Sequence, residues 1–176
     1  MQVSADEQIS KIIRDLNVLP EEVMWCTGSA LNHTADHLKK EIVKGISREQ
    51  RIKASLIRDR IEVVRSSRRS SRPLSKLLID LKKIYVKNLS DVKQTPIGVR
   101  AGGIMYPHAF IADLRKARKS KGVYRRVGKE RFPVKSVTIS IFEDVEKRIE
   151  DLTGTEAKEI FEKDFLHMLR RRTGAL

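Results

Sequence analysis

The segment from Tyr106 to Pro133 constrains the fold of this chain more than any other stretch. Two short apolar runs, Ala109–Ile111 and Val123–Tyr124, flank a basic connector that ends at Gly122. Apolar runs bounded by turn residues are typical of β-strands, so the pattern predicts two half-buried strands joined by a cationic loop. The segment has no obvious catalytic constellation. We therefore interpret it as a rigid pair of strands holding a basic arm, which indicates binding or assembly.

Helical patterns dominate the first third of the chain. Residues 4–16 have the apolar spacing of a short amphipathic helix. Pro20, followed by two glutamates, predicts the start of a long helix, and Gly45 is expected to end it in a left-handed conformation. Small residues on its apolar stripe would let this helix lie close to a sheet. Ser47 and Gln50 match a capping box and predict a third, short helix.

The middle of the chain has strand patterns. Residues 74–81 fit both a helical and an alternating spacing, and we favour a strand there. Gly102 and Gly103 predict a turn. Apolar and polar residues alternate from Val134 to Ser140, which is the period of a strand. The further short strand candidates are residues 61–64, 84–86 and 97–99.

Helical spacing returns after residue 141. Gly154 interrupts it, Thr155 is the expected cap of a last helix, and three arginines close that helix. Its apolar stripe of Phe161, Phe165 and Leu169 suits either a core or a subunit contact. The order of elements predicts an α+β fold, with a long N-terminal helix packed on a small antiparallel β-sheet and with C-terminal helices. We expect a single domain over residues 1–176, with a helical part (1–60), a sheet with basic loops (61–141) and C-terminal helices (142–172).

The charge of the chain favours an anionic partner. Its 176 residues have a formal net charge of +14, which biases the protein toward nucleic acid, an anionic membrane face or an acidic protein. A soluble subunit whose charge is neutralised by a neighbour is the plainer alternative. The lone cysteine, Cys26, cannot form an intrachain disulfide and is expected to be a small buried hydrophobe. We find no apolar run of transmembrane length and no signal peptide, so assembly in the cytoplasm is expected.

Enzymatic chemistry finds little support in the sequence. His33, His37 and Glu41 lie four residues apart on one helix face, a spacing that could bind a metal, but two histidines on a polar face are usually surface residues. No nucleophile elbow, phosphate-binding loop or paired carboxylates occur. We therefore expect a protein without catalytic activity, cofactor or metal.

Two basic segments are the candidate contact sites. The first choice is the connector within residues 115–121, and the second is the arginine-serine tract of residues 65–72. Neither contains aromatic residues, so we expect contact with a nucleic-acid backbone or a protein partner and no base stacking. A solvated connector is the alternative for both. The candidate residues are Arg115, Lys116, Arg118, Lys119, Lys121, Arg65, Arg68, Arg69 and Arg72.

Several short motifs in a fixed order resemble a known family. They are Ala30–Ala35 (ALNHTA), the arginine-serine tract with the Pro-Leu that follows, Pro107–Ile111 (PHAFI) and Arg126–Val134 (RVGKERFPV). Their order and spacing are similar to those of the minor tail protein Z family of tailed bacteriophages. The resemblance covers roughly residues 20–172. One departure is His33, where the family commonly has a basic residue.

The resemblance implies a virion structural protein of a phage tail, assembled in the host cytoplasm. Such proteins complete the tail at its head-proximal end near the neck and prepare it to join a filled head. The implied form is a homohexameric ring, with the tail terminator, tail tube and neck or connector proteins as partners. Backbone contact with packaged DNA and no membrane partner would fit that position. The alternative is a basic, sequence-independent nucleic-acid-binding protein.

Overall fold

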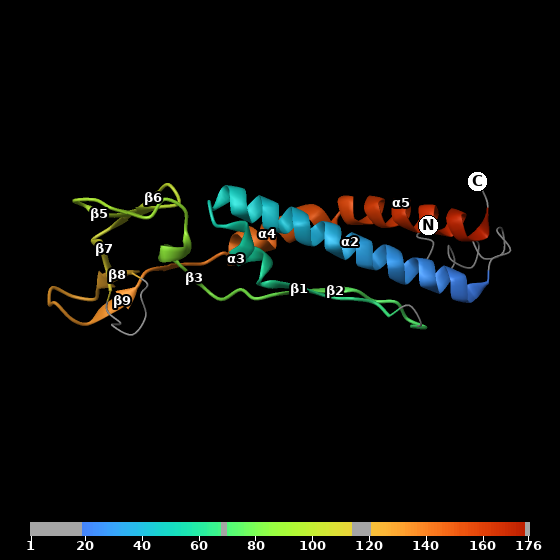
Figure 1. The fold of residues 1–176 in the computed structure, drawn as a ribbon, viewed down its shortest axis with the longest axis horizontal. Helices are drawn as coiled ribbons and strands as arrows, with labels where there is room; N and C mark the ends of the chain where they lie inside the picture. Colours follow the sequence, from blue (N-terminus) through green and yellow to red (C-terminus); the bar gives the residue numbers. More distant parts are fainter. Residues whose placement is uncertain (1–18, 68–69, 114–120, 175–176) are drawn as a thin grey trace. The chain divides into compact units, whose positions relative to one another are not determined.

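A computed structural model describes residues 19–67, 70–113 and 121–174 of the chain (Figure 1). The helix predicted at residues 4–16 lies outside the described residues. So do six of the candidate basic residues, namely Arg68, Arg69, Arg115, Lys116, Arg118 and Lys119.

The described elements run from helices through short strands to helices, as predicted. The pairings of β3 with β10, within β4–β5–β6 and within β7–β8–β9 are all antiparallel. Together with the long helix α2 and the C-terminal helices, these small sheets confirm the α+β class. The elements are α2 (Pro20–Glu49), α3 (Ala54–Arg58), β1 (Ile61–Val64), β2 (Lys76–Ile79), β3 (Ile84–Tyr85), the 3-10 helix η1 (Val86–Asn88), β4 (Lys93–Gln94), β5 (Gly98–Ala101), β6 (Ile104–Pro107), β7 (Ala109–Ala112), β8 (Gly122–Arg126), β9 (Val134–Ser136), β10 (Thr138–Ile139), α4 (Phe142–Thr153) and α5 (Glu156–Thr173).

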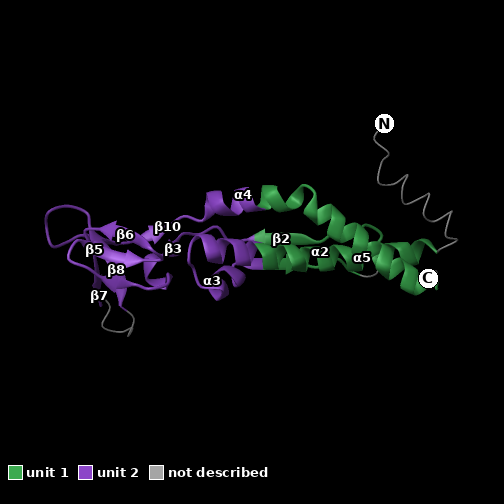
Figure 2. Ribbon diagram, turned by 90° about the horizontal axis from the view of Figure 1, so that it is seen from above, with its two compact units in different colours: residues 1–41, 62–78, 149–176 green, residues 42–61, 79–148 purple. Residues whose placement is uncertain are grey.

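The chain divides into two compact units (Figure 2). Unit 1 contains residues 1–41, 62–78 and 149–176, and unit 2 contains residues 42–61 and 79–148. The single domain over residues 1–176 stays a prediction.

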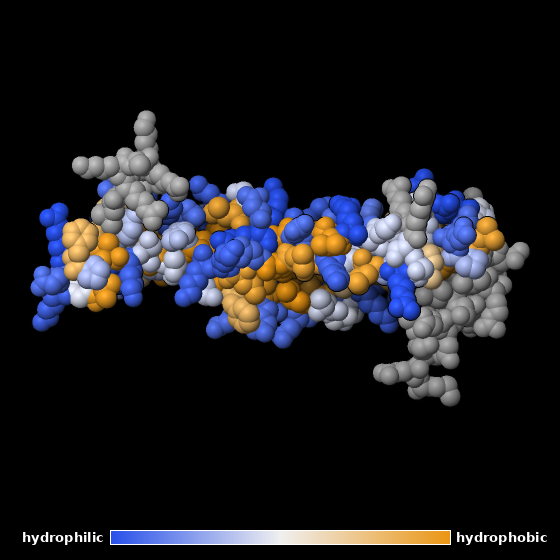
Figure 3. All heavy atoms as spheres, turned by 90° about the horizontal axis from the view of Figure 1, so that it is seen from below, coloured by the Kyte–Doolittle hydropathy of each residue, from blue (hydrophilic) through white to orange (hydrophobic). Residues whose placement is uncertain are grey.

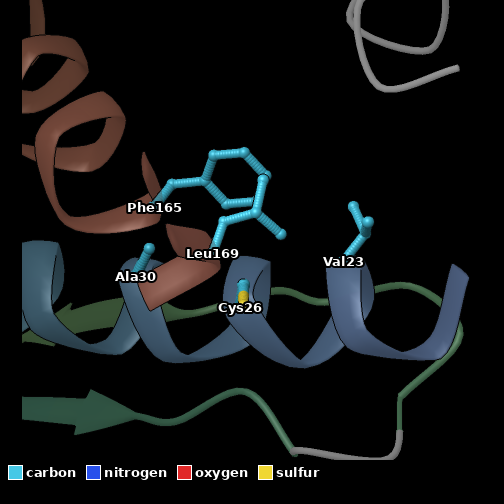
Figure 4. Close-up of a cluster of buried hydrophobic side chains, with 5 residues drawn as sticks. All are labelled: Val23, Cys26, Ala30, Phe165 and Leu169. Atoms are coloured by element: carbon cyan, nitrogen blue, oxygen red, sulfur yellow. The ribbon is translucent and has the colours of Figure 1, made fainter. Parts of the chain in front are cut away.

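The core of unit 1 lies between α2 and α5. Val23, Cys26 and Ala30 of α2 pack against Phe165 and Leu169 of α5 (Figure 4). Small side chains on α2 leave room for the large ones of α5, and the burial of this apolar surface stabilises the pair. Cys26 is fully buried, as predicted, and burial raises the pKa of its thiol. Of the two roles considered for the α5 stripe, a core role is therefore observed for Phe165 and Leu169.

The two strands predicted on either side of the basic connector form in unit 2. Strands β7 and β8 are antiparallel, and Phe110 lies opposite Tyr124, with 6.3 Å between their ring centroids. Ala112 at the end of β7 lies opposite Gly122 at the start of β8. The two strands thus flank the basic connector on either side, and β9 adds a third strand beside β8.

The alternating run that begins at Val134 differs from the single strand predicted. It forms two strands, with β9 paired to β8 and β10 paired to β3. Val137 stands between them, where its N–H donates to the carbonyl of Val123 and its own carbonyl accepts from the N–H of Val86. The alternation of residues persists because the chain stays extended while its pairing partner changes.

The predicted end of the long helix is wrong. Helix α2 continues through Gly45 to Glu49, because Gly45 keeps a helical conformation and is buried. A Cβ at this position would lie 2.5 Å from Nε of Arg148, so the glycine provides space for the Arg148 side chain. The capping box at Ser47 is also wrong, since the Ser47 hydroxyl donates to the carbonyl of Ile52 inside the turn after α2. The short third helix does form, as α3.

Candidate nucleic-acid or partner interface

The start of the arginine-serine tract is held against α2 in unit 1. Oδ1 of Asn32 accepts hydrogen bonds from the N–H of Ser66, at 2.7 Å, and from the hydroxyl of Ser75, at 2.6 Å. Nδ2 of Asn32 donates to the carbonyl of Ser66 at 3.1 Å, and Oγ of Ser66 accepts from the N–H of Leu74. Gly28 on the same helix allows the close approach, since a Cβ there would lie 3.3 Å from Oγ of Ser66. One α2 side chain therefore joins both flanks of the tract.

The described arginines of this tract differ in their surroundings. Nη2 of Arg65 lies 2.9 Å from Oδ2 and 3.1 Å from Oδ1 of Asp36, so its charge is partly neutralised by α2. Arg72 is exposed and has no ion-pair partner within residues 19–67, 70–113 and 121–174. Arg72 is thus the arginine of the described tract that is open to an anionic partner.

Lys121 is the described residue of the basic connector. It is exposed and directly precedes Gly122, where β8 begins. The antiparallel β7–β8 pair confirms the two predicted strands on either side of the connector, whose other basic residues lie outside the described residues. Whether Lys121 contacts DNA or a partner stays a prediction.

The positive charge of the chain is concentrated in the region of strands β3 to β9. Residues 82–135 contain 15 Lys and Arg but only three Asp and Glu, and so hold +12 of the net +14. The other residues contain 22 basic and 20 acidic side chains and are nearly balanced. An electrostatic partner would therefore be attracted mainly to this part of unit 2.

Two pairs of like charges face each other across strands in this region. Lys93 of β4 lies opposite Arg100 of β5, and Arg125 of β8 lies opposite Lys135 of β9. All four side chains are exposed, and none has an ion-pair partner in the described part of the chain. These pairs are not visible as a motif in the sequence, because the register that brings them together follows from strand pairing.

Apolar side chains also reach the surface (Figure 3). Val64, Leu74 and Leu78 are exposed around the β1–β2 pair of unit 1. In unit 2, Val127 and Phe132 are exposed in the loop between β8 and β9, with the guanidinium carbon of Arg131 5.9 Å from the Phe132 ring centroid. This loop belongs to the motif Arg126–Val134 and combines cationic with apolar contact groups.

The histidines on α2 have carboxylate neighbours on α5. Nδ1 of His33 lies 3.6 Å from Oδ2 of Asp164, and Nε2 of His37 lies 3.3 Å from Oε1 of Glu156. These contacts link the two helices of unit 1, and His33, His37 and Asp164 line a polar hollow together with Lys40. No group of three or more His, Cys, Asp or Glu side chains able to hold a metal ion occurs among the described residues.

At the C-terminus of α5, Arg172 connects the two helices of unit 1. Its Nε lies 3.6 Å from Oε1 of Glu22, and its guanidinium carbon lies 4.5 Å from the ring centroid of Trp25. The attraction between a cation and an indole face stabilises this contact, most strongly where water is excluded.

In the portion of the chain that is described, no helix is sufficiently long and apolar to span a bilayer.

Comparison with known proteins identifies the family. The family model of prophage minor tail protein Z (GPZ) matches residues 8–173. Searches of curated proteins and of solved structures found no significant match. The match covers nearly the whole chain, including both units, the tract, the connector and the cross-strand pairs. The chain therefore belongs to the prophage minor tail protein Z family, and it is a structural protein of the phage tail.

Proposed function

We propose that this minor tail protein completes the tail at its head-proximal end and makes it competent to join a filled head. The observation that carries the proposal is the concentration of +12 net charge in residues 82–135 of a phage tail protein. DNA must pass from the head into the tail at their junction. A subunit that lines this path needs contacts to phosphate that do not depend on base sequence, which lysine and arginine provide.

The proposed form is a homohexameric ring. Head-to-tail contacts between identical subunits form a closed ring when the rotation between neighbours closes. The proposed partners are the tail terminator, the tail tube and the neck proteins. The connector, residues 115–121, is the first candidate for contact with DNA or a neighbour, and the tract, residues 65–72, is the second. The family's structural role supports a protein without enzymatic activity.

The decisive experiment removes the protein during phage assembly. With an early stop codon in its gene, we expect filled heads and separate tails to accumulate, and wild-type protein supplied in trans to restore joined particles. Electron microscopy of lysates gives the counts. Complete infectious particles without the protein would contradict the proposal, and so would a lack of tails, since that would assign the protein to an earlier step.

The ring itself is tested by mass. Native mass spectrometry of the protein on isolated tails should give a species near six times the 20.2 kDa of the chain.

Replacing the connector cations Arg115, Lys116, Arg118, Lys119 and Lys121 by glutamine should preserve folding and reduce joining. The matched variant replaces the arginines of the tract by glutamine, namely Arg65, Arg68, Arg69 and Arg72. A greater loss of joining in this matched variant would assign the contact to the tract.

The charge distribution also favours a second function, that of a free-standing nucleic-acid-binding protein. This alternative predicts a monomer or dimer that binds duplex DNA tightly and leaves head-tail joining unaffected when it is removed. The joining experiment and the mass measurement therefore separate the two functions.

A further inference from the structure

We propose that the two cross-strand cation pairs of unit 2, Lys93–Arg100 and Arg125–Lys135, form a binding surface for the phosphates of duplex DNA. The pairs lie in register on neighbouring antiparallel strands, so each pair projects from one face of its sheet. This places the DNA contact on the sheets themselves, in addition to any contact made by the basic loops.

Like charges directly opposite each other on neighbouring strands destabilise a sheet. In both pairs the cations are exposed and have no ion-pair partner within the described part of the chain. Two unneutralised pairs of this kind in a small set of sheets are explained by a ligand that supplies the missing negative charge.

The two sheets that hold the pairs are joined. Oε1 of Gln94, the neighbour of Lys93, accepts from the N–H of Ile111 in β7 at 2.9 Å, and its Nε2 donates to the carbonyl of Gly98 in β5, also at 2.9 Å. A side chain at the edge of one sheet thus bonds to the first strand of the other. The cations are therefore attached to connected strands, which hold them in place better than a free loop would.

Charge density favours DNA over a second copy of the chain. Opposed Cβ atoms in a sheet lie only about 4.5–5.5 Å apart, so each pair is a compact doubly positive site. Duplex DNA presents a negative charge about every 1.7 Å along its axis, which suits such sites. Outside residues 82–135 the chain has 22 basic and 20 acidic residues, so a second copy offers no matching net negative charge.

This inference rests on the proposed function only for the source of the DNA, which would be the packaged genome. Binding itself is a property of the isolated protein. The DNA-binding test can therefore fail while the joining experiment succeeds, and the joining experiment can fail while the protein still binds DNA.

The test measures binding of the full-length protein to a random-sequence duplex by fluorescence anisotropy at several salt concentrations. Three variants are compared: Lys93→Gln with Arg100→Gln, Arg125→Gln with Lys135→Gln, and all four together. The matched control, Arg170→Gln with Arg171→Gln, removes two exposed charges from α5. Thermal unfolding shows whether each variant is folded. If the fourfold variant does not fold, the two double variants still test the proposal.

We expect each double variant to weaken binding several-fold and the fourfold variant to weaken it more than tenfold. The slope of log K against log salt should become shallower by about 0.9 for each phosphate that the variant no longer neutralises, and the control should stay close to wild type. Equal weakening in the control would overturn the proposal, because it would reflect net charge alone. Unchanged DNA binding with altered self-association would also overturn it, since the surface would then be an interface between copies.

Discussion

At the scale of single residues, glycines mark where two parts of the chain approach closely. Gly98 in β5 faces Tyr106 in this way, since an added Cβ would collide with the Tyr106 carbonyl oxygen and lie 3.0 Å from Cα of Pro107. Backbone atoms cannot move aside as the end of a flexible side chain can. The role of such a glycine is therefore to let β5 and β6 pair.

We predict that Gly98→Ala lowers the free energy of unfolding by about 2–4 kcal/mol. The control is Gly128→Ala, because an added Cβ there would meet nothing within 4 Å. Chemical denaturation of both variants measures the difference. Equal stability of the two variants would show that β5 can shift to accommodate the methyl group.

At the scale of elements, Asn32 joins helix α2 to both flanks of the arginine-serine tract. Asn32→Ala would leave the N–H of Ser66 without the 2.7 Å bond it now makes to this side chain. We predict a loss of about 1–3 kcal/mol in the free energy of unfolding, the usual cost of a buried polar group without its partner.

Asn32→Asp is the matched variant for this prediction. It keeps an oxygen acceptor for Ser66 and Ser75, but it replaces the amide that donates to the Ser66 carbonyl by a carboxylate oxygen. Its loss of stability should be smaller. An alanine variant as stable as wild type would mean that water replaces the side chain.

The like-charged pair of β8 and β9 gives a prediction of opposite sign. Lys135→Glu places a carboxylate opposite Arg125 and should raise the free energy of unfolding by about 0.2–1 kcal/mol. Lys129→Glu makes the same change of charge in the loop after β8 and serves as control. Thermal unfolding at low and high salt gives the comparison, and the gain should shrink at high salt. Destabilisation by Lys135→Glu would show that Lys135 has a structural role.

At the scale of the whole molecule, two buried groups lower stability as the pH becomes alkaline. Burial raises the pKa of Cys26 above its ordinary 9.0 and that of Tyr106 above its ordinary 10.0. At a pH between its ordinary pKa and its raised pKa, each group stays protonated in the folded protein but ionises in the unfolded chain. Their contribution to stability is therefore fully present below these ordinary values and is lost as pH rises through the folded pKa values.

We predict that the free energy of unfolding falls as pH increases beyond 9.0, through Cys26, and that Tyr106 adds a further fall beyond 10.0. Denaturation at a series of pH values measures the curve. Tyr106→Phe should flatten the upper part of the fall, because it removes a phenol whose hydroxyl is buried without a hydrogen-bond partner among the described residues. A curve that is level across this range would contradict the assignment of both groups.

The sequence by itself determined the types of element, their order and the family. Local spacing revealed the long helix, the β7–β8 pair and the C-terminal helices, because helical and strand periods depend on near neighbours. Cys26 could be assigned to the interior because a lone thiol beside apolar residues is usually buried. The charge of +14 was also visible in the sequence, and it indicated an anionic partner.

Only the tertiary structure decided what those residues do. Gly45 lies within its helix and close to the Arg148 side chain, and the alternating run after Val134 divides because its halves pair with different strands. Strand register also brought Arg125 opposite Lys135. Contacts between distant positions depend on which segments meet in the folded chain, and no local period records them. This is why the sequence indicated the basic loops, whereas the structure added the paired cations of the sheets.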